Sequence, residues 1–182
     1  MTRVRTFASR DDLPDDRRKD YDVVFEGLGR VRGPFAVMLH SPGLASGTWA
    51  AVAGTTDDVL VSPALHELVV LAIAYFYDAP YQWSAHINRA REVGLSEATI
   101  EVARVGGDTS TLDPDDRDVI EYTRQLSTGH HAEQTLFGAL RDRHSERWLV
   151  ELTSTIGLYQ YVATFNNAFE IDELLGTDRL VQ

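Results

Sequence analysis

The two residues of this sequence best suited to chemistry are a glutamate and a histidine, Glu67 and His86. Histidine exchanges protons readily near neutral pH, and a carboxylate beside the ring can orient it and fix its tautomer. Two antiparallel helices joined near Asp78 would bring these positions toward each other, although a separation of 19 residues does not itself fix a distance. We therefore predict a proton-transfer site at which Glu67 orients His86.

The helix expected over residues 80–92 defines the surroundings of His86. At about 100° per residue, Gln82 lies on the same face as His86, and Trp83, Ile87 and Ala90 form an apolar edge beside that face. This apolar edge would pack against the hydrophobic core, so we expect His86 to lie at the border of the core. Gln82 can donate and accept hydrogen bonds, but its amide does not take up a proton at neutral pH.

The same residues also fit purely structural roles. A lone histidine on a half-buried helix face can be a structural residue whose ring nitrogens are hydrogen-bonded. Glu67 can likewise be an acid that interacts favourably with the positive end of a helix dipole. Tyr81 and Trp83 fit a hydrophobic core as well as a ligand site. The remaining histidines show no metal-ligand spacing, so we expect no metal.

Composition excludes several classes of function. The chain has no cysteine, which removes disulfides, thiolate nucleophiles and cysteine-based zinc sites. Its 28 acidic and 17 basic residues give a net charge of -11, which argues against nucleic acid and anionic lipid as partners. The longest apolar run, Leu68 to Tyr77, is half of the ~20 residues that span a bilayer, and the N-terminal residues lack an apolar signal segment. We expect a cytoplasmic protein.

Helix start and stop signals divide the chain into short helical segments. Ser62, Ser96 and Ser145 are suited to N-caps, and Gly29 to a helix end. A length of 182 residues fits one domain, and we predict an all-α fold of seven to nine helices. The segments expected to contain the helices are 15–29, 33–56 (two short helices divided at Ser41-Pro42-Gly43), 62–77, 80–94, 96–107, 113–129, 131–144 and 145–175.

One long block of the sequence resembles a known family. HELVVLAIAYFYDAPYQWSAHINRAREVGLSEATI, residues 66–100, is similar to the carboxymuconolactone decarboxylase family of alkylhydroperoxidase-like proteins. The resemblance extends to GRVRGPFAVMLHSPGLA (29–45), LDPDDRDVIEYTRQL (112–126) and LYQYVATFNNAFEID (158–172). It implies an alkylhydroperoxidase-like helical bundle, a single domain over residues 1–182 with its core block at about 34–170, and a homo-oligomer, a trimer or hexamer. A partner subunit could also supply cover for the apolar helix at 68–77.

The sequence departs from that family at two informative positions. In the peroxidase branch a Cys-x-x-Cys motif lies between the glutamate and the histidine, but Ala79 and Gln82 stand at its two cysteine positions. Thiol peroxidase chemistry is therefore lost, because no other group of the chain can cycle through sulfenate and disulfide. In the decarboxylase branch the motif is Tyr-Glu-Trp-x-x-His, and Gln82 replaces its glutamate, which leaves Glu67 and His86 as the titratable pair.

The resemblance implies a cofactor-independent lyase that acts on a small carboxylated lactone or related oxo acid. His86 would donate the proton, Glu67 would orient the His86 ring, and Gln82 would bind a carbonyl or carboxylate oxygen. The alternatives are an isomerase, cyclase or hydrolase with the same Glu/His pair, or a ligand-binding protein without catalysis. The residues expected to bind the small, anionic substrate are Gln82, Tyr81, Trp83, His40, Arg30 and Arg89, with Arg32 as a further candidate counter-charge.

Overall fold

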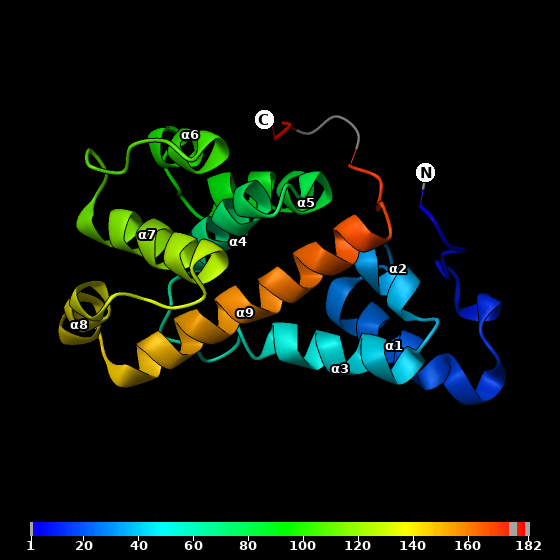
Figure 1. Cartoon of the computed structure of the whole chain (residues 1–182). Helices are drawn as coiled ribbons and strands as arrows, with labels where there is room; N and C mark the ends of the chain where they lie inside the picture. The colour runs from blue at the N-terminus through cyan, green and yellow to red at the C-terminus, as the bar shows by residue number, and fades with distance from the viewer. Residues whose placement is uncertain (1, 175–177, 181–182) are drawn as a thin grey trace.

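The computed structural model describes residues 2–174 and 178–180 of the chain. These residues form α-helices and two short 3-10 helices without a strand, which confirms the predicted all-α fold (Figure 1). The helices are η1 (Arg10–Asp12), η2 (Asp15–Arg17), α1 (Arg18–Leu28), α2 (Pro34–Met38), α3 (Pro42–Ala53), α4 (Pro63–Phe76), α5 (Pro80–Glu92), α6 (Glu97–Val105), α7 (Pro114–Thr128), α8 (Gln134–Arg143) and α9 (Glu146–Ala168).

The helix ends follow from local sequence chemistry. The side chains of Ser62, Ser96 and Ser145 each accept a hydrogen bond from a backbone N–H in the first turn of α4, α6 and α9, as expected of N-caps. Gly29 ends α1 with a left-handed φ of 68°, a conformation that glycine adopts without steric cost. These signals confirm the predicted boundaries between the central helices.

One predicted boundary was wrong. The first helical segment begins at Asp15, as predicted, with a 3-10 turn that leads directly into α1 at Arg18. The last helix was expected to continue to position 175, but α9 ends at Ala168, and Ile171 to Leu174 have no regular secondary structure. Residue 175 itself lies outside the described residues. Apolar residues continue beyond Ala168, which is why the sequence pattern did not mark this end.

Helix α4 is the centre of the larger hydrophobic core. It packs against α5, α6, α7 and α9, and every residue from Leu68 to Ala74 is at most 1% exposed. The chain therefore covers residues 68–74 by itself, while Tyr75, Phe76 and Tyr77 at the end of the apolar run are half-buried. Of the two sources of cover left open by the sequence, the same chain supplies that of residues 68–74.

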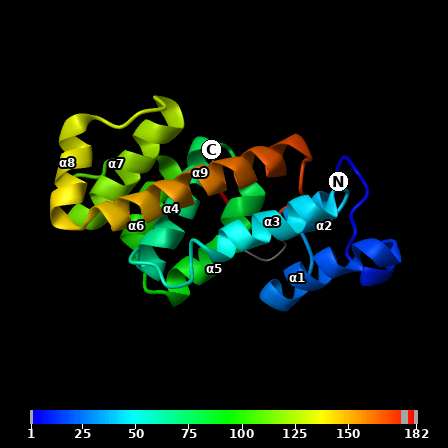
Figure 2. The same cartoon turned by 90° about the horizontal axis from the view of Figure 1, so that it is seen from below.

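Helix α9 connects the larger core around α4 with a smaller core formed by α1, α2 and α3. It runs diagonally across the molecule, from α8 at one end to α2 at the other (Figure 1), and it lies beside α3 when seen from below (Figure 2). The smaller core packs on this side, including Val24, Phe35 and Leu39. No helix within the described residues is long and apolar enough to cross a membrane.

Candidate active site

The side chains of Glu67 and His86 meet at the contact between α4 and α5. Nδ1 of His86 lies 2.9 Å from Oε2 of Glu67, a normal hydrogen-bonding distance. Glu67 is 7% exposed and lies in the second turn of α4, rather than on an exposed first turn. The tight turn between the helices, in which Asp78 has a positive φ of 46°, returns α5 along α4 and brings the two positions together.

The surroundings of Glu67 determine which ring nitrogen of His86 is available for chemistry. Burial alone would raise the pKa of Glu67, but the charge of His86, the hydrogen bond from His86 and the nearby His66 outweigh burial and lower the pKa to about 2. Glu67 is therefore ionised at neutral pH and can only accept hydrogen bonds. Nδ1 of His86 consequently carries the hydrogen, and Nε2 is free to exchange a proton.

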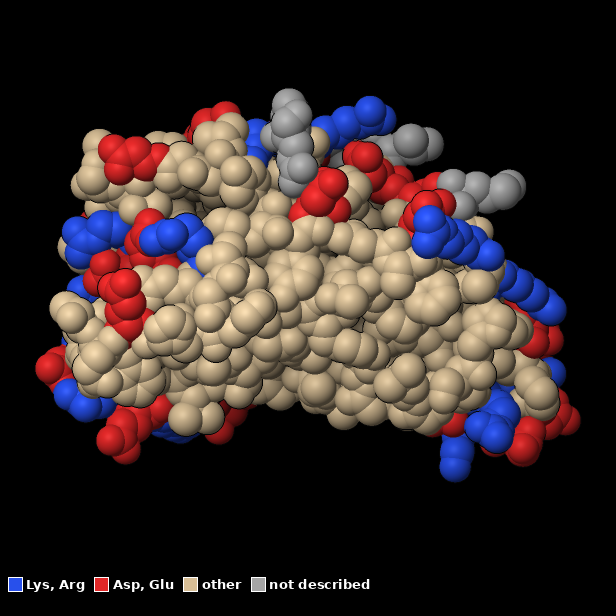
Figure 3. Space-filling view, viewed as in Figure 1, with Lys and Arg blue, Asp and Glu red and all other residues tan. Residues whose placement is uncertain are grey.

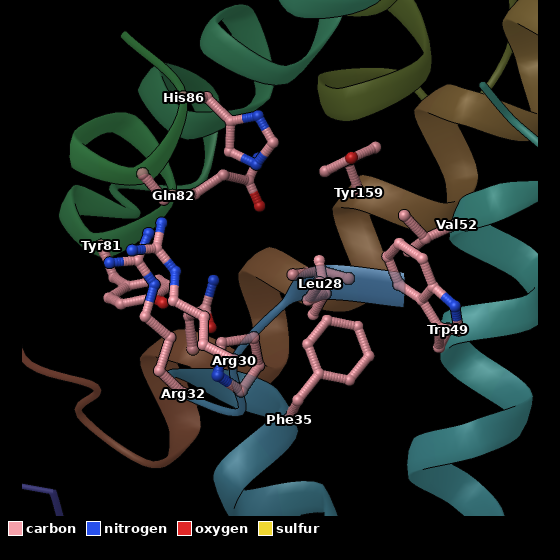
Figure 4. A pocket seen from close by; sticks show the side chains of 14 residues that line it. Leu28, Arg30, Arg32, Phe35, Trp49, Val52, Tyr81, Gln82, His86 and Tyr159 are labelled. Carbon is pink, nitrogen blue, oxygen red and sulfur yellow. The ribbon is translucent and has the colours of Figure 1, made fainter. Parts of the chain in front are cut away.

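A cavity of about 230 Å³ lies in front of His86. Figure 4 shows one nitrogen of the His86 ring directed into the cavity, and this nitrogen is Nε2 because Nδ1 contacts Glu67. Helices α5 and α9, the end of α1, the following loop, α2 and α3 surround the cavity. The residues that line it are Leu28, Arg30, Arg32, Pro34, Phe35, Trp49, Val52, Tyr81, Gln82, Ala85, His86, Tyr159, Val162 and Asn166.

Gln82 has a fixed orientation at the wall of this cavity. Nε2 of Gln82 donates to the carbonyl oxygen of Val70 at 3.0 Å, while Oε1 is buried and has no partner among the described residues. A carbonyl oxygen cannot donate, so the amide cannot be turned round without losing this bond. Oε1 is directed toward the cavity (Figure 4), so this atom would accept a hydrogen bond from a ligand donor. Binding of a carbonyl or carboxylate oxygen by Gln82 would use the second N–H of Nε2 and stays a prediction.

Two arginines supply positive charge at the cavity. Arg30 and Arg32 lie on the same side of it as Tyr81, away from Trp49 and Val52 (Figure 4). Every other arginine of the chain forms an ion pair with an aspartate or glutamate, but neither Arg30 nor Arg32 has such a partner among the described residues. Their charges are thus available to an anionic ligand.

Tyr81 holds the loop that carries these arginines. A Cβ atom at Gly33 would lie only 1.9 Å from the Tyr81 hydroxyl, and Gly33 has a φ of 57°, so both the space and the conformation require glycine. Burial is the main reason why the pKa of Tyr81 is raised, although Arg32 and Arg30 act in the opposite direction. Tyr81 therefore lines the cavity as a neutral phenol.

Three residues expected to bind substrate lie elsewhere. Trp83 is fully buried in the main core, with the guanidinium of Arg104 4.8 Å from its ring. Nε2 of His40 contacts the backbone oxygen of Arg5 at 2.8 Å, outside the cavity. Arg89 pairs with Glu92. It lines a separate cavity of about 250 Å³, which His66 and Glu67 also line.

The structure adds three site residues that the sequence patterns did not identify: His66, Tyr159 and Asn166. Nδ1 of His66 lies 3.6 Å from Oε1 of Glu67, so the carboxylate faces a histidine at each oxygen. The ring of Tyr159 packs edge-on against both histidines, with centroid distances of 5.4 Å. Burial, with a smaller contribution from Glu67, raises the pKa of Tyr159, so this side chain stays protonated.

Asn166 lies on the same face of α9 as Tyr159, seven residues later, which is two helical turns. A polar residue in an otherwise apolar helical stripe was the available sequence signal. Within the described part of the chain, no group of three histidine, aspartate or glutamate side chains is arranged to hold a metal ion. The site thus consists of acid–base, amide and guanidinium groups against an apolar wall.

Comparisons with known proteins show which fold this is. No protein-family model matches the sequence, and no curated protein matches it. A peroxidase-related protein from Silicibacter sp. TM1040 has a similar structure, with a TM-score of 0.79 and 15% identity over 97% of this chain and 93% of that one. A peroxidase-related protein from Ralstonia eutropha JMP134, described as an alkylhydroperoxidase AhpD core, has a TM-score of 0.78 and 16% identity over 96% and 93% of the two chains.

A third similar structure is a cysteine-to-alanine variant of the debrominase Bmp8 in complex with 2,3,4-tribromopyrrole. Its TM-score is 0.75, with 17% identity over 96% of this chain and 94% of that chain. At these identities the likeness establishes the architecture and leaves the chemistry to be argued from the site. The chain has the alkylhydroperoxidase-like helical fold, with a Glu67–His86 pair and no cysteine at its cavity.

Proposed function

We propose that the protein is a cofactor-independent acid–base enzyme, a decarboxylase-like lyase that acts on a small carboxylated lactone or related oxo acid. The observation that supports this most strongly is the free Nε2 of His86 at the cavity, with Nδ1 held by the ionised Glu67. A group arranged in this way can give a proton to bound substrate and recover it from solvent. Thiol chemistry is not open to the chain, which has no cysteine.

The proposed reaction begins with a carboxylate beta, or vinylogously beta, to a carbonyl group. The bond to the carboxylate carbon breaks, carbon dioxide leaves, and the electron pair of that bond forms an enolate. Protonated His86 then transfers its Nε2 proton to carbon, and the neutral ring is reprotonated by water. Glu67 stabilises the charged ring before the transfer and keeps it oriented afterwards.

The size of the cavity supports a small substrate. A cavity of ~150 Å³ is enough for benzene, so about 230 Å³ accommodates one substituted ring. The debrominase variant of the same fold binds 2,3,4-tribromopyrrole, also a single ring. A compact lactone or cyclic oxo acid is therefore a suitable class of substrate.

The proposal can be tested by incubating the protein with carboxylated lactones and β-oxo acids in D₂O. Carbon dioxide release and deuterium incorporation into the product would be measured together. His86→Gln should lower the rate ~10²–10⁴-fold, the usual contribution of a positioned acid or base. His131→Gln is the matched control, because His131 is exposed and outside the cavity.

Each outcome assigns a different function. Deuterium exchange without carbon dioxide would contradict the lyase and favour an isomerase or cyclase that uses the same pair. Saturable binding without turnover in the wild type would favour a ligand-binding protein. Equal rates for wild type and His86→Gln would contradict every function that depends on the His86 proton.

We also propose that the protein forms a homo-oligomer through the face built by α3 and α9. No Lys, Arg, Asp or Glu occurs between positions 152 and 169, and Figure 3 shows a broad face without charged side chains over these helices. Val150 and Tyr161 on α9 are 65% and 37% exposed. Because each copy has a net charge of -11, self-association is least opposed where charge is absent.

A further inference from the structure

We propose that the cavity selects a carboxylate that also carries a hydroxyl or N–H donor, with Gln82 and Asn166 recognising the donor-bearing end and Arg30 and Arg32 the carboxylate. This assignment rests on the proposed function for its site and adds the class of substrate. It makes Asn166 a specificity-determining residue. Binding of such a ligand can be measured without turnover.

The donor requirement comes from Gln82. Its amide is held by the bond from Nε2 to the Val70 carbonyl oxygen, and Oε1, which has no partner within the described part of the chain, is directed toward the cavity (Figure 4). A buried acceptor that stays unpaired destabilises the protein, and a ligand that donates to it removes this penalty. A ketone, ether or carboxylate oxygen at this point would instead face an acceptor. The ligand group that meets Oε1 of Gln82 must therefore be O–H or N–H.

The position of Gln82 also relates this donor to the chemistry. Gln82 and His86 are neighbours on one face of α5, and Figure 4 shows the Gln82 oxygen and one His86 ring nitrogen both directed into the cavity. A hydroxyl oxygen between them can accept a hydrogen bond from protonated His86 while it donates to Gln82. An enol or phenol has this pair of properties.

Asn166 offers a second polar contact. It is 2% exposed, lines the cavity, and neither Oδ1 nor Nδ2 has a hydrogen-bond partner among the described residues. Such a side chain is unusual in a folded protein, because buried amides are nearly always paired. Its one acceptor and two donor hydrogens fit a polar ligand substituent rather than an apolar one.

Arg30 and Arg32 require the ligand to be an anion. They are the arginines that lack an acidic partner within the described part of the chain, which has an excess of acidic residues. A guanidinium binds a carboxylate in a planar, bidentate manner. Apolar side chains complete the cavity, including Leu28, Phe35, Trp49 and Val52, and they suit the flat body of one ring.

The test uses stable probes that cannot lose carbon dioxide under the assay conditions. Benzoate, 3- and 4-hydroxybenzoate, the two corresponding methoxybenzoates and phenol would be titrated into the wild-type protein. Binding would be followed by tryptophan fluorescence, since Trp49 lines the cavity, and checked by calorimetry. At least one hydroxybenzoate should bind about 10-fold more tightly than benzoate and its own methyl ether, the gain expected for about 1.4 kcal/mol. Phenol should bind more weakly than that hydroxybenzoate.

Variants assign each preference to its residue. Gln82→Met has a similar volume but no amide oxygen, so it should abolish the preference for hydroxyl over methoxy. Asn166→Leu should lower the affinity for the hydroxybenzoate about 10-fold and leave benzoate binding nearly unchanged. Arg30→Gln and Arg32→Gln should weaken benzoate and hydroxybenzoate equally, by about 10-fold each, without changing the hydroxyl preference. Arg124→Gln, in an exposed ion pair with Glu121, is the matched control.

The wild-type titrations decide the inference even if a buried variant fails to fold. Equal affinity for hydroxy- and methoxybenzoates, or no binding of any probe, would overturn it. Phenol binding as tightly as the hydroxybenzoates would overturn the carboxylate assignment. Hydroxyl-selective binding together with no turnover of any oxo acid would sustain this inference while the proposed function fails, so the two results are distinguishable.

Discussion

Glu67 turns its second carboxylate oxygen toward His66, whose Nδ1 lies 3.6 Å from Oε1 of Glu67. The other oxygen, Oε2, is 2.9 Å from His86. The carboxylate is thus held between two histidines, and this arrangement makes an ionised glutamate stable in a position that is 7% exposed. Its effects on stability and its effects on catalysis can be measured separately.

The first prediction concerns the pH dependence of stability. The pKa of Glu67 is lowered from 4.5 to about 2, so its ionisation favours the folded state above pH 4.5 and this contribution is lost as pH falls toward 2. Glu67→Gln should lower the free energy of unfolding at pH 7 by up to about 3 kcal/mol, and the difference from wild type should shrink below pH 4.5. Urea unfolding of both proteins at several pH values measures this difference in the free energy of unfolding.

Glu92→Gln is the control for this experiment, since Glu92 is an exposed acid paired with Arg89. It should change stability by less than about 1 kcal/mol at any pH. A constant difference between Glu67→Gln and wild type across the acid range would show that Glu67 is not stabilised as a carboxylate.

The second prediction concerns Tyr159, whose ring contacts His66 and His86 edge-on. Tyr159→Phe keeps both ring contacts and should change stability by less than about 1.5 kcal/mol, whereas Tyr159→Ala leaves a void and should cost about 3–5 kcal/mol. Thermal or urea unfolding gives both values. A similar loss in the two variants would mean that the hydroxyl, and not the ring, supports the histidines.

The helical frame and the His86 face were predictable because they depend on local rules. Serine caps act within one turn, and Gln82 and His86 share a face because they are four residues apart. The same geometry explains the error at Trp83. Tyr81 and Trp83 are two positions apart, about 200° around the helix, so only one could face the cavity while the other entered the core.

The opposite wall of the cavity depends on contacts between distant segments. Arg30, Trp49 and Asn166 line the same cavity as His86 only because α9 packs against α5 and the α1–α3 group packs beside α9, and no sequence spacing encodes these approaches. The orientation of the Gln82 amide could likewise not be predicted from the sequence, since it depends on the carbonyl of Val70 in the neighbouring helix. His40 illustrates the converse, because its partner Arg5 belongs to the N-terminal segment outside the cavity.

The third prediction concerns the close contact between α1 and α3. A Cβ atom at Gly27 would lie 2.1 Å from Cε2 of Trp49, which lines the cavity and meets Phe35 edge-on. Gly27→Ala should therefore displace Trp49, cost about 1–3 kcal/mol and weaken ligand binding. Tryptophan fluorescence and urea unfolding measure these effects. Gly138→Ala in α8 meets no atom within 4 Å and should be neutral or stabilising by up to about 1 kcal/mol.

The fourth prediction tests self-association through α3 and α9. Val150 on α9 is 65% exposed and lies two positions before the stretch 152–169, which has no charged residue, so a charge there would be desolvated on assembly through this helix. Val150→Asp should shift the mass measured by light scattering after size exclusion toward the monomer, while helical content remains unchanged by circular dichroism. Val105→Asp is the matched control, because Val105 is 48% exposed on α6. Equal dissociation by both variants would indicate general charge repulsion, and a monomeric wild type would contradict assembly altogether.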